Sequence, residues 1–540
     1  MWKFFLGTRT RSSLTMSTKQ HDHLDHDHKD AGTLVQHSAA EAMDAKGGQD
    51  LVEEEFTEAE YKRLRLKFDL ILMPMLMICK VDVTAAANRA VYGLQFSDKT
   101  ALTWGLIFNL REDTHMSLQQ YSLLSVWFYM AYGVFQLPMM SLLQRVPLGR
   151  GLAACIIIWG GMVMAHAACK SYAELTVVRI LLGWFECVVT PGFAIFTSSW
   201  YLRREQTHRQ MMYYSMNSFF SVVFGVGVYF IAKNAEERGG MSGWRVINLF
   251  LGGTTVGMGI VFLVFGGTPQ EVWWLSAREK RMAQARIVSN ATGTGAQATW
   301  NWDQVKECFK DPQFYFGILY GFMAQIPNGA ITTFSSLVIK SFGFDSLQTV
   351  LYNIPGYATA FAFIITSATL VLYVPKLRFP LALFFQLVTF IALLFIAVAP
   401  NAGKWARWGV WTAFSHVFPL GTFLVAWPMM SLNIAGRTKK TFFSSCCLVS
   451  YCVGNMVGTQ IMRPSDSPRY VKGLTITSIF LLVNSTNLVV WWMYLRRENK
   501  KRDAECEASG ISAEEREQLN QQAGVDDITD RKNRNFRYFH

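Results

Sequence analysis

The chain has little charge and no framework of paired cysteines, and both shortages limit what it can be. Of its 540 residues, 17% are charged and 51% are hydrophobic. A soluble protein of this length carries more charge and divides into several domains. The nine cysteines show no CxxC spacing, so a disulfide-stabilised fold is not indicated. No HExxH or GxSxG motif is present, which argues against an intramembrane enzyme.

Apolar blocks hold most of the hydrophobic residues. Twelve of these blocks approach the length of about 20 residues that a helix needs to cross a bilayer. The sequence therefore predicts an all-α membrane protein with twelve transmembrane helices in two six-helix halves. The blocks lie near residues 69–108 (interrupted), 120–143, 150–168, 173–201, 211–232, 244–265, 314–339, 351–373, 379–398, 408–432, 441–462 and 473–494.

Polar segments surround and divide the two groups of blocks. Both tails are expected to be largely disordered because they are polar or charged. The N-terminal tail contains the run HDHLDHDH, which suggests either a metal-binding tract or a solvated tail, and we favour the solvated tail. The predicted organisation is a tail (1–66), an N-terminal half (67–266), a central loop (267–313), a C-terminal half (314–495) and a second tail (496–540).

Basic residues beside the apolar blocks predict the orientation. The short loops on the two sides carry ten basic residues each. Clusters before the first span, in the central loop and after the last span break this tie, and they predict that both termini and the central loop are cytoplasmic. The central loop includes an amphipathic stretch that begins at Pro269, with Thr268 as the expected N-cap of a surface helix. The net charge of +12 therefore indicates contact with lipid headgroups rather than nucleic acid.

Arg179 and Glu186 interrupt the fourth block. They are seven residues apart, so both side chains point to the same side of a helix, roughly 10 Å apart along its axis. In hydrocarbon each charge costs about 2.5–3.5 kcal/mol, and such residues usually face a substrate or proton pathway. The alternative is a buried salt bridge that locks one helix. We favour the pathway, because this spacing is wider than the i,i+4 contact distance.

A second charged pair, Asp98 and Lys99, lies in the irregular first block. We favour a functional role for this pair as well. The alternative is a pair that lies at a helix end among the lipid headgroups. The stretch 80–91 before it contains residues that are poorly suited to hydrocarbon, and removing the stretch would leave one continuous span. We hypothesise a gene-model artefact such as retained intronic sequence, with a divergent first helix as the alternative.

Several motifs make the chain resemble the major facilitator superfamily, and within it the anion:cation symporter family and its fungal allantoate permease-like branch. The resemblance covers about residues 60–502. It depends on the order and spacing of the motifs rather than on any single one. They are LLQRVPLGR (142–150), RILLGWFECVVTPGFAIFTSSWYLRREQTHR (179–209), GWRVINLFLGG (243–253), KDPQFYFGILYGFMAQIPNGAITTFSSLVIKSFGF (310–344) and WPMMSLNIAGRTKK (427–440).

This resemblance implies proton-coupled import of a small organic anion such as allantoate, ureidosuccinate or nicotinate. In such symporters the acids carry protons, a role that falls here to Asp98 and Glu186. The base of the first span meets the substrate carboxylate, a role that falls to Lys99. A proton-loaded cavity that also contains Arg179 is net positive and attracts the anion. Lysine cannot form the bidentate fork that arginine makes with a carboxylate. We expect no cofactor beyond the proton gradient, a monomer, and the plasma membrane.

Further residues are candidates for the cavity and for the gates. Gln325, Asn328 and Trp427 are expected to line the cavity, and Pro327 and Pro355 are expected to break their helices. Six residues of two cytoplasmic loops are expected to latch the inner gate, although positive-inside anchoring explains them nearly as well. These six are Arg145, Gly149, Arg150, Gly436, Arg437 and Lys439.

Other functions remain open from the sequence. A facilitator or a drug:proton antiporter would have the same fold. A nutrient sensor could use a transporter fold without net flux, since long tails are compatible with signalling.

Overall fold

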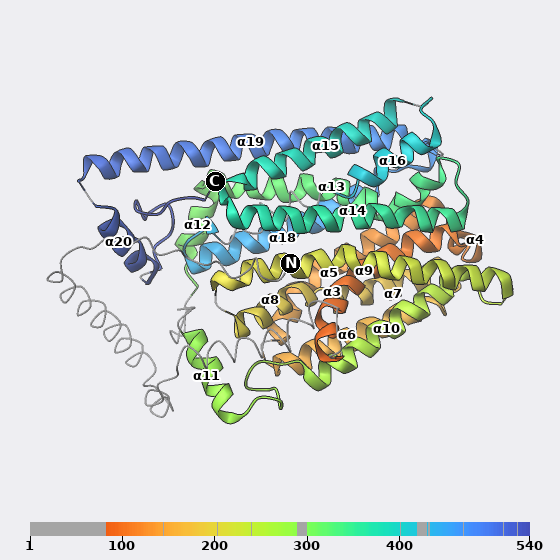
Figure 1. Cartoon of the computed structure of the whole chain (residues 1–540), viewed down its shortest axis with the longest axis horizontal. Coiled ribbons are helices and arrows are strands. Elements are labelled where there is room, and N and C mark those ends of the chain that lie inside the picture. Colours follow the sequence, from red (N-terminus) through yellow and green to blue (C-terminus); the bar gives the residue numbers. More distant parts are fainter. Residues whose placement is uncertain are drawn as a thin grey trace, which may run out of the picture. The chain divides into compact units, whose positions relative to one another are not determined.

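The computed structural model describes residues 83–539 apart from 144, 202, 239, 289–299, 400, 418–428, 430–431, 468, 511 and 526. Every regular element in this part of the chain is a helix (Figure 1), which confirms the all-α fold. The N-terminal half contains α3 (Val83–Ile107), α4 (Leu110–Asp113), α5 (Leu118–Leu143), α6 (Leu148–His166), α7 (Tyr172–Glu186), α8 (Val189–Trp200), α9 (Arg203–Arg238) and α10 (Gly243–Phe265).

Two short helices, α11 (Ala277–Val288) and α12 (Trp302–Lys310), lie between the halves in the sequence. The C-terminal half and the following tail are also helical. They contain α13 (Pro312–Lys340), α14 (Ser346–Tyr373), η3 (Pro375–Leu377), α15 (Arg378–Val398), α16 (Lys404–Phe414), α18 (Arg437–Thr459), η4 (Pro464–Asp466), α19 (Val471–Ala508) and α20 (Ala513–Val525).

Nine helical stretches among the described residues are long and apolar enough to cross a membrane. They correspond to nine of the twelve predicted spans. The helices α3 and α13 occupy the first and seventh predicted spans and are long enough, with 25 and 29 residues, but they are not among these nine. The tenth predicted span begins with α16 and continues into residues outside the described part.

The stretch 80–91 does not interrupt a helix where the structure describes it. The helix α3 runs from Val83 to Ile107 without a break, which gives a length of about 37 Å at 1.5 Å per residue. The apolar run before it lies outside the described residues. The artefact hypothesis stays a prediction about the transcript.

The fourth span is broken at the residue that carries one of its charges. The helix α7 ends at Glu186, and α8 begins at Val189. Pro191 explains the break, because it has no N–H to offer to the carbonyl of Cys187 and its ring crowds that turn. The predicted breaks at Pro327 and Pro355 were wrong, since both lie inside continuous helices. Membrane helices tolerate such prolines when neighbouring groups satisfy the freed carbonyl.

The helices pack in pairs within each half and across the two halves. In the N-terminal half α6 packs on α10 and α5 on α7, and in the C-terminal half α13 packs on α18 and α15 on α19. Across the halves, α9 meets α14, α5 meets α18 and α3 meets α13. Glycines allow close approach, as membrane helices often require. A Cβ on Gly183 would press on the carbonyl oxygen of Phe128, and one on Gly454 would press on that of Phe322.

The surface helix of the central loop begins later than predicted. It starts at Ala277, and Ser276 caps it together with Glu279, whose backbone N–H lies 3.3 Å from the Ser276 hydroxyl. The preceding residues fold back instead of continuing the helix. The indoles of Trp273 and Trp274 donate hydrogen bonds to the last carbonyl groups of α10. The prediction that Thr268 caps a helix starting at Pro269 was therefore wrong.

The C-terminal tail is ordered, which corrects the expectation of disorder. The helix α19 continues for 38 residues to Ala508, well beyond the predicted end of its span, and α20 follows it. Beyond α20, the side chains of Thr529 and Asp530 are buried. Ion pairs and hydrogen bonds between the tail and the C-terminal half hold this segment, and composition alone does not reveal them.

Candidate functional site

The four charged residues predicted from the first and fourth spans converge in the structure. Asp98, Arg179 and Glu186 are 3%, 4% and 0% exposed. Lys99 is the most accessible of the four, with 19% of its side chain exposed. The Nζ atom of Lys99 lies 3.1 Å from Oε1 of Glu186. The ion pair therefore joins one member of each predicted pair, and it links α3 to α7.

The remaining two members, Asp98 and Arg179, lie close to this ion pair. Arg179 is within electrostatic range of Asp98 and Glu186. No Arg179–Glu186 ion pair occurs among the described residues, so the alternative of a salt bridge within one helix finds no support. Both carboxylate oxygens of Asp98 are buried without a hydrogen-bond partner of normal geometry.

Aromatic rings surround the Lys99 ammonium. Its Nζ atom lies 5.6 Å from the ring centroid of Phe128 and 5.8 Å from that of Tyr132. Rings within about 6 Å stabilise a cation by cation–π attraction. The neighbouring Tyr129 meets Tyr451 of α18 edge to face, with centroids 6.3 Å apart. Both halves of the protein therefore contribute to the surroundings of the charges.

The predicted cavity residues of the C-terminal half form an amide network. Asn455 Nδ2 donates to Gln325 Oε1 over 3.3 Å, and Asn328 Nδ2 donates to Asn455 Oδ1 over 2.9 Å. The network joins α13 to α18. Gln325 and Asn328 thus bind a neighbouring helix in this conformation, while Trp427 lies outside the described residues.

A second set of polar contacts joins the two halves near the start of α5. The hydroxyl of Tyr121 donates to the carbonyl oxygen of Thr333 over 2.9 Å. Gln119 Nε2 donates to Gln460 Oε1 over 2.9 Å, and Gln460 Nε2 donates to the Ser122 hydroxyl over 3.2 Å. These contacts close one end of the bundle, and the basic residues beside the spans predict that this end faces outside. The contacts are called the outer closure below. Sequence reasoning missed them, because isolated polar residues in apolar helices look like packing contacts.

The first predicted gate loop binds the central loop. The backbone N–H groups of Leu148 and Gly149 donate to the Glu271 carboxylate over 2.9 and 2.8 Å. A carboxylate here also offsets the positive end of α6. Arg145 and Arg150 are exposed. This loop therefore takes its acid from the segment after α10, which supplies the carboxylate that the loop itself lacks.

The second predicted gate loop binds the C-terminal tail. Lys439 is buried and forms ion pairs with Asp311 at 2.7 Å, Asp530 at 2.9 Å and Glu307 at 3.0 Å. The backbone N–H of Arg437 donates to Asp527 over 2.7 Å. All of these partners belong to α12, the C-terminal half or the tail. The expected latch between the halves stays a prediction for another conformation.

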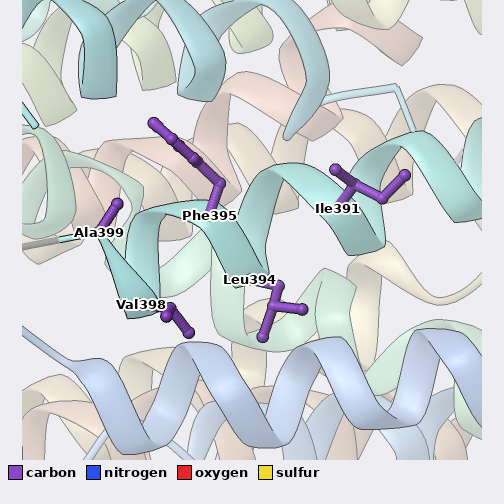
Figure 2. Close-up of a pocket in the computed structure, with 5 residues that line it drawn as sticks. All are labelled: Ile391, Leu394, Phe395, Val398 and Ala399. Carbon is purple, nitrogen blue, oxygen red and sulfur yellow. The ribbon is translucent and has the colours of Figure 1, made fainter.

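Two pockets are lined by none of the four charged residues. Both run along α15 and are lined by apolar side chains. Figure 2 shows the five residues of one of them on a single helix, with carbon atoms alone in their side chains. Grooves of this kind suit lipid chains and offer nothing to hold an anion. The five residues are Ile391, Leu394, Phe395, Val398 and Ala399.

Comparisons with known proteins agree with this architecture. The Major Facilitator Superfamily model matches residues 91–459, so the match begins where the unusual stretch 80–91 ends. An uncharacterized transporter of Schizosaccharomyces pombe, C757.13, is 31% identical over 507 residues and covers 92% of both chains. The allantoate permease of Saccharomyces cerevisiae is 30% identical over 510 residues and covers 92% of this chain and 90% of its own.

Two further similarities extend the comparison. The thiamine pathway transporter THI73 of Saccharomyces cerevisiae is 28% identical over 522 residues and covers 94% of this chain and 92% of its own. Among solved structures, a bacterial homolog of the human lysosomal transporter Spinster, inward-facing and unoccupied, superposes with a TM-score of 0.56. It covers 76% of this chain and 96% of its own at 16% identity, which supports the fold.

Proposed function

The chain belongs to the major facilitator superfamily and to its fungal allantoate permease-like branch, and on that premise we propose that it imports a small organic anion together with protons. It is a multi-pass membrane protein of a transporter family. The proposed part is the direction of transport, the proton coupling, the class of substrate and a location in the plasma membrane.

The ion pair between Lys99 and Glu186, 3.1 Å apart, is the observation that carries the proposal. An ionised Glu186 pairs with the ammonium group of Lys99, which a substrate carboxylate would also need as its partner. A proton on Glu186 removes this competitor, and Lys99 becomes free to bind the anion. Proton and anion binding would therefore favour each other through a shared partner, which is positive linkage between two sites.

Charge balance supports a symport cycle. With both acids ionised and no substrate bound, Asp98 and Glu186 neutralise Lys99 and Arg179. Protonation of the acids leaves a positive site that attracts an anion. A bound anion with too few protons would leave excess charge in the bilayer, and such charge is costly. The empty carrier and the loaded carrier would therefore reorient more easily than partly loaded states.

Contacts between the halves support alternating access. The links from Tyr121 to Thr333 and from Gln119 to Gln460 join α5 to α13 and α18 at one end of the bundle. Under the predicted orientation this end faces outwards, so the conformation corresponds to a carrier closed to the outside. Breaking these few hydrogen bonds would be part of opening to the outside.

The allantoate permease among the relatives supports a small carboxylate as the substrate class. One relative is named an allantoate permease and another a thiamine pathway transporter. Allantoate is a ureido carboxylate, and its acid group matches the bases at the site. The aromatic rings of Phe128, Tyr132 and Tyr451 would pack against the rest of such a molecule.

Uptake of a labelled panel tests the proposal. Allantoate, nicotinate, pantothenate, cysteine and a sulfonate are offered to cells with and without the protein, at two external pH values. We expect at least one carboxylate to accumulate faster at the lower pH, and a protonophore to stop the accumulation. Uptake that ignores both pH and protonophore would indicate a facilitator. Export of the compounds would indicate an antiporter, and binding without flux would indicate a sensor.

A further inference from the structure

The segment Asp527–Phe539, called the strap below, lies against three separate parts of the chain. It contacts α12, the loop that precedes α18, and the end of α19. Three of its side chains are as buried as core residues, since Thr529, Asp530 and Tyr538 are 1%, 0% and 3% exposed. The strap therefore docks on this surface through these residues.

The first docking contact is with the buried Lys439. An ammonium group has three donors. Here Glu307, Asp311 and Asp530 each accept one of them, so a third of its coordination comes from the strap. Burial raises the pKa of Asp530, and the Lys439 ammonium opposes that rise. Asp530 also accepts a hydrogen bond from the Tyr538 hydroxyl over 3.0 Å.

The second docking contact is with the start of α18. Asp530 Oδ1 accepts from the backbone N–H of Ala435 over 3.2 Å, and Asp527 accepts from that of Arg437. The positive N-terminal end of α18 stabilises carboxylates at this position. Gly436 has a φ of 90°, and a Cβ added to it would lie 2.8 Å from Thr529 Cγ2. The strap thus packs directly on the loop that was predicted to belong to the inner gate.

The third docking contact is with the end of α19. Arg502 Nη2 donates to the Tyr538 hydroxyl over 2.9 Å, and the guanidinium lies 4.5 Å from the centroid of the same ring. Asn499 of α19 exchanges two hydrogen bonds with the backbone of Tyr538. Asn433, which precedes α18, exchanges two with the backbone of Phe539. The end of the strap is therefore fastened by paired hydrogen bonds.

The helix α18 connects the strap to the candidate site. Its first residues, Arg437 and Lys439, bind the strap, while Tyr451 in its middle lies among the rings near Lys99. Just beyond its other end, Gln460 contacts α5 in the outer closure. A restraint on the first turn of α18 acts on a helix that reaches both the charged residues and the closed end.

We propose that the strap is an intramolecular brake, and that it must loosen from Lys439 before α18 can move during transport. This inference rests on the proposed transport function. The docking contacts described above are mainly polar, so water and ions can replace them when the strap leaves, which would be far harder for an apolar core. The strap gives the transporter a resting form that changes in the tail could release.

Limited proteolysis tests the docking without any substrate. The Asp530→Ala variant removes the strap's acceptor for Lys439 and leaves Glu307 and Asp311 in place. We expect the tail to be cleaved about tenfold faster, because cleavage follows the population of the open form and a tenfold change corresponds to 1.4 kcal/mol. Arg534→Ala is the matched control, since its side chain is 64% exposed and pairs with the partly exposed Glu505. Equal cleavage of the wild type and Asp530→Ala would overturn the docking.

Transport rates test the brake itself. We expect Asp530→Ala and Tyr538→Phe to raise the initial uptake rate several-fold without changing the half-saturation concentration. Tyr538→Phe loses a single hydroxyl, so it keeps the test valid if Asp530→Ala fails to fold. An unchanged or lower uptake rate in folded variants with a freed tail would contradict the brake, because the strap would then be a structural support.

A labelling experiment separates failure of the brake from failure of the proposed function. If the wild type takes up none of the panel at either pH, the proposed import is wrong. The Ser125 hydroxyl lies 3.5 Å from the Thr333 hydroxyl in the outer closure. The brake is then measured by the reaction of the Ser125→Cys variant with a thiol reagent added outside. Faster labelling in Tyr538→Phe supports the brake, and an unchanged rate contradicts it.

Discussion

The ammonium nitrogen of Lys99 lies 3.1 Å from Oε1 of Glu186, so a buried ion pair joins the first span to the fourth. The two residues come from separate helices, and each had a different expected neighbour in the sequence. Their pairing leaves Asp98 and Arg179 nearby as a second acid and a second base. The following two predictions depend on this pair.

Glu186→Gln is expected to uncouple transport from protons. Glutamine keeps the shape of the side chain, but it cannot gain or lose a proton. We expect pH-driven accumulation to disappear, while exchange of labelled for unlabelled substrate persists. The control is Glu174→Gln in the same helix, because Glu174 is exposed and should leave accumulation intact. Accumulation at low external pH by Glu186→Gln that matches the wild type would remove Glu186 from the coupling mechanism.

Lys99→Ala is expected to weaken anion binding. The variant removes the accessible base of the site, and the loss of an ion pair of about 1.4 kcal/mol corresponds to a tenfold rise in the half-saturation concentration. Uptake over a range of substrate concentrations measures this change. Lys340→Ala removes an exposed lysine at the end of α13 and serves as the control. If Lys99→Ala transports with an unchanged half-saturation concentration, another group holds the anion.

Much of this site could be predicted from the sequence, but the pairing could not. The high cost of charge in hydrocarbon makes Arg179 and Glu186 conspicuous in an apolar block. The length of the blocks likewise predicts most of the spans. Which acid meets Lys99 depends on how α3 and α7 are rotated against each other, and that rotation is set by packing across the whole bundle.

The contacts of the central loop and of the C-terminal tail were also beyond prediction. Glu271 and Asp530 lie in polar stretches, where composition indicates solvation. Each instead binds backbone groups or a buried lysine that is distant in the sequence. Such contacts depend on complementary positions of donors and acceptors in space, and no local pattern records them.

Tyr121→Phe is expected to loosen the outer closure. The variant deletes the hydroxyl that donates to Thr333 across the two halves. A hydrogen bond worth about 1 kcal/mol corresponds to roughly fivefold more of the open form. The measurement is labelling of Ser125→Cys by an impermeant thiol reagent added outside. Tyr315→Phe, which removes an exposed hydroxyl bound to Phe309, should not change the labelling rate. Equal labelling in both variants would show that the Tyr121 contact does not hold the closure.

Two neighbouring glycines of α10 provide a test of helix packing. A Cβ on Gly252 would lie 2.6 Å from the Met164 backbone nitrogen and 2.7 Å from the Gly160 carbonyl oxygen, whereas one on Gly253 meets nothing within 4 Å. Gly252→Ala should therefore destabilise the fold by about 1–3 kcal/mol through overpacking. Gly253→Ala should leave the melting temperature of the purified protein nearly unchanged. A similar melting temperature for both variants would contradict the close packing of α6 on α10.

The break between α7 and α8 has a mechanical consequence. Glu186 is the last residue of α7, and two residues of turn follow it before α8 begins at Val189. Cys187 and Val188 keep right-handed helical backbone angles, so the span continues past Glu186 with an interruption in its hydrogen bonding. Beyond the interruption, α8 is tied to the central loop through the Trp200 indole, which donates to the Gly267 carbonyl oxygen. A bend of the fourth span at this point would therefore move the central loop that connects the two halves.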